Sequence, residues 1–145
     1  MNIQYPKYPP GEVFISFCGR NATEAELWQG LPEGIVYNKQ TGNEFLDLFV
    51  SIVHDSMEHD TAFYAKKLGV TKQDLSGCLK VLTGLGTGEW IDAYVQLAVC
   101  DLLRNTDFSI SEIARLTGYP DLRTLSHAFG RIHGMPPSRW REKYK

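Results

Sequence analysis

Residues 109–140 read SISEIARLTGYPDLRTLSHAFGRIHGMPPSRW, and this stretch decides the fold. Its first part predicts a short helix that begins at Ser109 or Ser111 and ends at Gly118, because glycine readily adopts the left-handed conformation that ends helices. Four side chains have the spacing of an inward face: Ile110, Ile113, Ala114 and Leu116.

A turn at Tyr119–Asp121 then leads into a second predicted helix over Leu122–His133. Spacings of four and three residues place Leu125, Phe129 and Ile132 on one buried face of this helix. Gly134 ends it, and Pro136-Pro137 fits the first turn of a last helix, with Trp140 as a further core residue. A helix, a tight turn with glycine and a second helix form a helix-turn-helix unit.

The same pattern occurs a second time, upstream, in TAFYAKKLGVTKQDLSGCLKVLTG (residues 61–84). A long helix over Glu89–Asn105 joins the two units, and a further helix begins at Glu44 with Asn43 as its cap. Its apolar stripe is predicted to be Phe45, Leu48, Phe49, Ile52 and Val53. We therefore expect an all-α domain over residues 44–145. Residues 1–43 are expected to form an irregular arm, with a short strand at 12–17 and a helical turn at 23–30.

Composition excludes several classes of protein. The formal net charge is −2 over 145 residues, so any surface for nucleic acid must be local. Cys18, Cys78 and Cys100 are scattered, which argues against a disulfide framework or a metal site and fits the cytoplasm. The sequence shows no signal peptide, no apolar run long enough for a membrane span and no nucleophile–base pair. We expect no enzyme, no cofactor and no membrane partner.

Residues 45–145, about two thirds of the chain, resemble the DNA-binding domain of the AraC/XylS family of bacterial transcription regulators, most closely its short stand-alone members. The resemblance lies in LLRNTDFSISEIARLTGY and in TLSHAFGRIHGMPPSRWR. It implies two helix-turn-helix units on a linker helix, double-stranded DNA as partner and RNA polymerase as a candidate second partner. It names no effector.

Recognition helices place side chains against base edges in the major groove. In the second unit the candidate DNA-binding residues are Arg123, Thr124, His127 and Arg131. Arg123 is the best candidate for reading a base, and Arg131 is a candidate phosphate contact. In the first unit the candidates are Lys72, Gln73, Ser76 and Lys80.

The first helix-turn-helix unit is expected to contribute less to DNA recognition than the second. Gly77 stands where the family commonly has an arginine, and residues 81–103 contain no lysine or arginine. Residues 44–105 hold five basic and nine acidic residues, a net charge of −4, whereas residues 106–145 hold seven basic and four acidic residues, a net charge of +3. Because phosphate contacts dominate DNA affinity, the C-terminal unit should carry most of the binding. The acidic first half keeps an alternative open, a degenerate fold that acts as a protein–protein interaction module.

Overall fold

The computed structural model describes residues 43–145, and within this range it contains helices and no strand. The helices are α3 (Glu44–Ser56), α4 (Thr61–Leu68), α5 (Lys72–Thr83), α6 (Thr87–Asn105), α7 (Ile110–Leu116), α8 (Leu122–His133) and α9 (Pro137–Tyr144). The all-α prediction is confirmed for this part of the chain. The strand expected at residues 12–17 and the helical turn at 23–30 lie outside the described residues.

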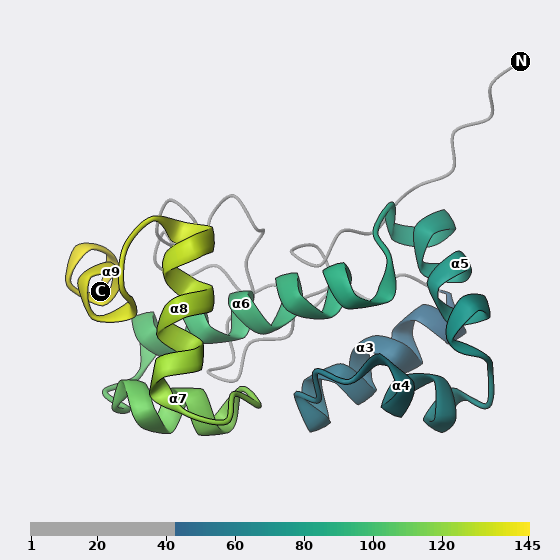
Figure 1. The fold of residues 1–145 in the computed structure, drawn as a ribbon, viewed down its shortest axis with the longest axis horizontal. Helices are drawn as coiled ribbons and strands as arrows, with labels where there is room; N and C mark the ends of the chain where they lie inside the picture. Colours follow the sequence, from purple (N-terminus) through teal and green to yellow (C-terminus); the bar gives the residue numbers. More distant parts are fainter. Residues whose placement is uncertain (1–42) are drawn as a thin grey trace, which may run out of the picture.

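Helix α6 crosses the middle of the molecule, with one helix-turn-helix unit at each end (Figure 1). The first unit is α4–α5, with α3 packed against α4, and α5 contacts α6. The second unit is α7–α8, and α9 packs against both α6 and α8. The two predicted units and their linker helix are therefore confirmed.

Short polar residues fix where the helices begin. The side chain of Thr71 accepts a hydrogen bond from the backbone N–H of Asp74 at 3.0 Å, and Ser109 accepts one from Glu112 at 3.1 Å. Both satisfy an N–H that has no partner inside its helix. At the other end of α8, Gly134 has a φ of 73°, a left-handed conformation that costs glycine little.

Aromatic side chains fill the core of each unit. In the first unit Trp90 stacks on Tyr94 with ring centroids 5.2 Å apart, and Phe49 lies 5.0 Å from Trp90. In the second unit Phe129 meets Trp140 edge-on at 6.1 Å. The predicted core residues of the second unit are all buried: Ile113, Ala114, Leu125, Phe129 and Trp140.

Three residues predicted to face inward are exposed instead, namely Leu48 (53% exposed), Leu116 (37%) and Ile132 (49%). Each is adjacent in sequence to a residue that is less exposed to solvent: Phe49, Thr117 and His133, respectively. Directly after α7, Thr117 is fully buried, and its hydroxyl donates to the carbonyl of Ile113 at 2.7 Å. On α8 the stripe continues from Phe129 by four residues to the half-buried His133, so Ile132 turns toward solvent.

Candidate nucleic-acid interface

Helix α8 is anchored by its buried inner face and has a side-chain cap at its N-terminus. Leu125 and Phe129 are fully buried and anchor its inner face. The Asp121 carboxylate accepts hydrogen bonds from the backbone N–H of Thr124 at 2.8 Å and from its hydroxyl at 2.7 Å. The backbone bond, followed by the hydroxyl bond, holds the pKa of Asp121 below its usual value, so the cap is an anion at neutral pH.

The outer face of α8 carries the predicted DNA-binding side chains. Arg123, His127 and Arg131 are exposed and follow one another at intervals of four residues, which places them in one row along the helix. Thr124 is also exposed, but its hydroxyl already donates to Asp121. The row of two arginines and one histidine is therefore the part of α8 best arranged to reach base edges and phosphates.

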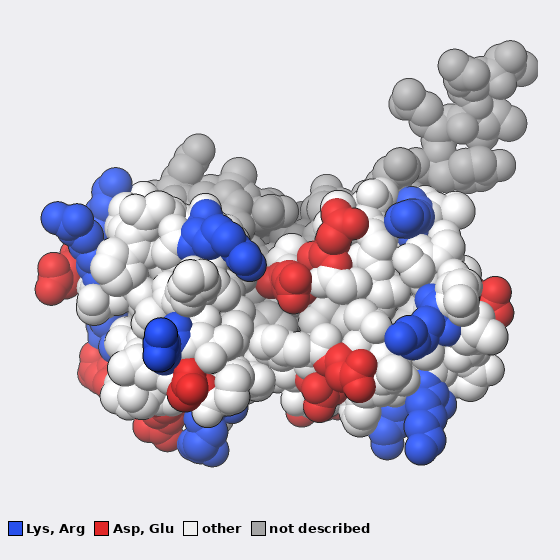
Figure 2. Space-filling view, viewed as in Figure 1, with Lys and Arg blue, Asp and Glu red and all other residues white. Residues whose placement is uncertain are grey.

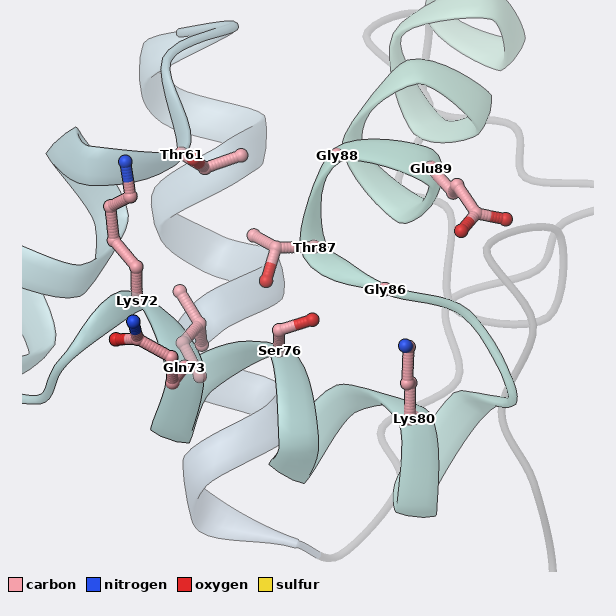
Figure 3. A pocket seen from close by; sticks show the side chains of 10 residues that line it. Thr61, Lys72, Gln73, Ser76, Lys80, Gly86, Thr87, Gly88 and Glu89 are labelled. Atoms are coloured by element: carbon pink, nitrogen blue, oxygen red, sulfur yellow. The ribbon is translucent and has the colours of Figure 1, made fainter.

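The predicted residues of the first unit lie together on α5, but they face a groove. Lys72, Gln73 and Lys80 are exposed and Ser76 is half-buried. All four border a groove of about 470 Å³ whose opposite wall is the first turn of α6 (Figure 3). Gly77 is exposed on the same helix, and as a glycine it offers no side chain to a base.

Acidic side chains occupy the face between the two recognition helices. Figure 2 shows basic side chains over α8 and over α5, with carboxylates gathered between them. On the first two turns of α6 the exposed carboxylates are Glu89 and Asp92. Partial desolvation raises the pKa of Asp92, while the nearby His59 and Arg131 oppose that rise. Arg131 therefore lies within electrostatic reach of a carboxylate that would repel phosphates.

The joint between the two units was not foreseen from the sequence. His59, in the loop before α4, donates from Nε2 to the carbonyl of Thr117 at 2.8 Å, and its ring meets that of Tyr119 edge-on at 4.7 Å. Gln96 on α6 donates to the Tyr119 hydroxyl at 2.6 Å. These contacts join the turn of the second unit to the loop before α4 and to α6.

Arg141 has a structural position. Its guanidinium donates to the carbonyls of Leu103 at 2.9 Å, Thr106 at 3.2 Å and Phe108 at 2.6 Å. These bonds satisfy carbonyls at and just beyond the C-terminal end of α6, where a positive charge is also favourable. The arginine that follows Trp140 therefore joins α9 to α6.

Residues 43–145 contain no cluster of three or more histidine, cysteine or acidic side chains suited to a metal ion. None of their helices is long and apolar enough to cross a membrane.

Comparison with known proteins places this geometry in context. A family model described as a helix-turn-helix domain matches residues 64–143. The HTH-type transcriptional activator RhaR of Yersinia pestis is 28% identical over 130 residues, which cover 86% of this chain and 41% of RhaR. The chain thus spans about two fifths of the length of this relative.

Solved structures share the fold. The C-terminal domain of the two-component response regulator YesN from Fusobacterium nucleatum superposes with a TM-score of 0.63 at 20% identity, covering 68% of this chain and 99% of that domain. The DNA-binding domain of AdpA, a global transcriptional factor crystallised with a target DNA, gives a TM-score of 0.62 at 24% identity, covering 68% and 91%. Both structures cover about two thirds of this chain and share its fold.

Proposed function

The chain belongs to the AraC/XylS family of helix-turn-helix regulators, and from that premise we propose that it is a sequence-specific DNA-binding transcription regulator in which the C-terminal unit dominates. Its partner in this proposal is double-stranded DNA, and RNA polymerase is the second partner. Its place of action is the cytoplasm. The proposal includes no reaction and no cofactor.

The observation that carries the proposal is the outer row of α8. Arg123, His127 and Arg131 are exposed on a helix whose inner face is fixed by Leu125 and Phe129. An arginine reads guanine through two parallel hydrogen bonds, which need a rigid platform behind the side chain. A helix with a buried inner face and a capped start provides that platform.

Charge supports the unequal roles of the two units. Residues 106–145 carry a net charge of +3 and residues 44–105 one of −4. The Glu89 carboxylate lies at the start of α6 and lines the groove beside the first recognition helix. A backbone phosphate near Glu89 is repelled, so the first unit gains less from DNA than the second.

The test is a binding titration on a duplex selected from genomic fragments, at two salt concentrations. Arg123→Ala should cost about 1–3 kcal/mol and relax specificity at one base pair. Arg131→Ala should weaken binding to all sequences alike and reduce the salt slope by about one. Gln73→Ala should cost less than Arg123→Ala, and Lys143→Ala, on α9, is the control for loss of one exposed positive charge.

Two outcomes would contradict parts of the proposal. Similar losses from Gln73→Ala and Arg123→Ala would refute the dominance of the C-terminal unit and leave the regulator intact. If no duplex binds in a salt-dependent way, the regulator itself is refuted. The acidic side chains between the recognition helices then favour the protein–protein interaction module.

A further inference from the structure

The groove between α5 and the start of α6 is lined by charged side chains of both signs. Its volume of about 470 Å³ is within the range of small-ligand pockets. Lys72 and Lys80 line it from α5, and Glu89 lines it from α6 (Figure 3). No ion pair joins any two of these three side chains in the part of the chain that the structure describes. The groove therefore presents two positive charges and one negative charge to a ligand.

Thr87 gives an independent indication that a ligand belongs in the groove. This residue is 5% exposed and lines the groove, yet its hydroxyl has no hydrogen-bond partner among the described residues. In Figure 3 the hydroxyl points toward Ser76, into the space between the two helices. A buried hydroxyl without a partner destabilises a fold, so a ligand oxygen that accepts from Thr87 would remove this cost.

Polar side chains converge in front of Gly86, the N-cap residue of α6. A Cβ placed on Gly86 would lie 3.4 Å from the hydroxyl oxygen of Ser76 and 3.6 Å from a carboxylate oxygen of Glu89. The Cε of Lys80 is also 3.6 Å from that point. Gly86 has a φ of −71° and a ψ of 169°, which any residue can adopt, so the backbone does not require glycine here. The missing side chain leaves this corner of the groove open.

We infer that the groove binds an acidic α-amino acid, of the aspartate or glutamate class. Such a ligand has two carboxylates and one ammonium group, the reverse of the two lysines and one carboxylate that line the groove. Charge-assisted hydrogen bonds of this kind are the strong ones. The inference therefore rests on complementary charge and on the buried Thr87 hydroxyl, two separate observations.

Each group of the ligand has a partner in the groove. No side chain among the described residues caps α6, so the N–H groups of its first turn and the Thr87 hydroxyl donate to the α-carboxylate. The aligned peptide dipoles favour negative charge at the same place. Glu89 accepts from the ammonium group. Lys72, which lies on the other side of Ser76 from Lys80 in Figure 3, pairs with the side-chain carboxylate.

The Glu89 carboxylate distinguishes this ligand from a DNA phosphate. A phosphate brings only negative charge to Glu89 and is repelled, whereas an amino acid brings an ammonium group to the same carboxylate. A groove that binds the amino acid is therefore consistent with a first unit that gains little from the DNA backbone.

The bound amino acid would weaken the contribution of the first unit to DNA binding, and this part of the inference rests on the proposed function. The ligand lies against Lys72, Gln73 and Ser76, which are candidate DNA-binding side chains of α5. Side chains that hold the ligand are not free to contact DNA. The amino acid is then an effector that lowers affinity for the duplex.

Binding is measured without DNA, so its failure is separate from failure of the regulator. Sodium L-glutamate and sodium L-aspartate are titrated separately into the full chain, and backbone amide shifts are followed by NMR. Glutarate, which has two carboxylates and no ammonium group, and inorganic phosphate are the reference anions at matched ionic strength. The amides of Gly86, Thr87 and Gly88 should shift saturably with at least one of the two amino acids. Glutarate and phosphate should bind about tenfold more weakly, because they lack the partner of Glu89.

Two results of this titration would overturn the inference. The first is the absence of a saturable shift with either amino acid. The second is an equal affinity for the amino acid and for glutarate, since the ammonium group would then have no partner in the groove.

Glu89→Gln should change the affinities for the two kinds of ligand in opposite directions. It should weaken binding of the amino acid about tenfold, because it removes the partner of the ammonium group. It should tighten binding of glutarate several-fold, because it removes a charge that repels carboxylates. Lys143→Ala on α9 is the control and should change neither affinity. A change of the same sign for both ligands in Glu89→Gln would overturn the inference.

Two further variants test the position of the ligand. Thr87→Val should weaken binding of the amino acid about tenfold without lowering the melting temperature in ligand-free buffer, because the hydroxyl that it removes has no partner. Gly86→Ala should also weaken binding several-fold, because its Cβ enters the corner between Ser76 and Glu89 while the backbone stays unstrained. Unaltered affinity in both variants would overturn the inference.

The selected duplex tests the effector role. The saturating amino acid should weaken duplex binding relative to glutarate at matched ionic strength, and this difference should disappear in Glu89→Gln. Equal duplex affinity in the two salts would overturn the effector role. Absence of any duplex binding would refute the proposed function, while the amino-acid site is decided by the titration without DNA.

Discussion

Arg131 and Arg141 lie ten residues apart and carry the same charge, but they have different surroundings. Arg131 is exposed on the outer face of α8, near Asp92. Arg141 is half-buried, and its guanidinium donates to the backbone carbonyls of Leu103 and Phe108. Charge in the sequence therefore does not distinguish an arginine that can bind DNA from one that joins two helices. Arg141 has a structural role because the fold brings it next to backbone carbonyls at the end of α6 that have no partner within the helix.

The buried ring of Phe129 should dominate the stability of the second unit. Phe129 is fully buried and packs against Trp140 and His133. Phe129→Ala should lower the free energy of unfolding by about 3–5 kcal/mol, because it leaves a cavity that the fold only partly closes. Ile132→Ala, at an exposed position of the same helix, should change it by less than about 0.5 kcal/mol. Urea unfolding measures both, and equal losses would contradict the observed orientation of α8.

His133 should make the fold sensitive to mild acid. Its ring lies 3.9 Å from that of Phe129, and burial lowers its pKa from 6.5 to about 4. The unfolded chain therefore binds this proton first as pH falls, so stability is full above about pH 6.5 and is lost as pH falls toward 4. We expect the wild-type melting temperature to fall across this window more steeply than that of His133→Phe. Parallel pH profiles would show that His133 titrates alike in both states.

At the scale of elements, helix ends were more predictable than helix faces. The bounds of α8 match the expected Leu122–His133, because Asp121 and Gly134 mark its ends through local chemistry. Which face of a helix is buried depends on the helices that pack against it, and the local sequence pattern does not give their positions. On α3 apolar residues occur on adjacent positions, and packing buries Leu46 and Val50 while exposing Leu48. Periodicity alone cannot choose between such neighbouring stripes.

The start of α6 should limit DNA affinity through its charge. Asp92 is exposed there, within electrostatic reach of Arg131. Asp92→Asn should tighten binding to any duplex, by a few-fold at low salt and by less at high salt, because it removes a carboxylate that repels phosphates. Glu142→Gln on α9 is the control for loss of one negative charge. The measurement is the titration at two salt concentrations, and an unchanged affinity would place Asp92 away from the DNA.

At the scale of the whole molecule, function depends on how the two units sit relative to each other. The bond from His59 to the Thr117 carbonyl and the bond from Gln96 to Tyr119 tie the second unit to the loop before α4 and to α6. The sequence predicted both recognition helices from local patterns. It could not predict this joint, because its partners lie 58 and 23 residues apart. The groove between α5 and the start of α6 was also missed, because its two walls come from different helices whose packing the local pattern does not specify.

Gly118 is where this joint can be tested. It has a φ of +82°, and a Cβ there would lie 2.1 Å from the carbonyl oxygen of Met57. Gly118→Ala must therefore shift the second unit away from the first, in addition to the roughly 1–2 kcal/mol cost of a left-handed non-glycine residue. Gly134→Ala is the matched control, because it has the same backbone strain at a φ of +73° and nothing within 4 Å of its Cβ.

Both variants should melt below the wild type, with Gly118→Ala lower than Gly134→Ala. The decisive measurement compares affinity for the full selected site with affinity for the half that α8 binds. The ratio of the two affinities should fall in Gly118→Ala, because two units with altered spacing cannot both reach a site one DNA turn apart, and should stay unchanged in Gly134→Ala. An unchanged ratio in Gly118→Ala would mean that the first unit adds nothing that depends on its position.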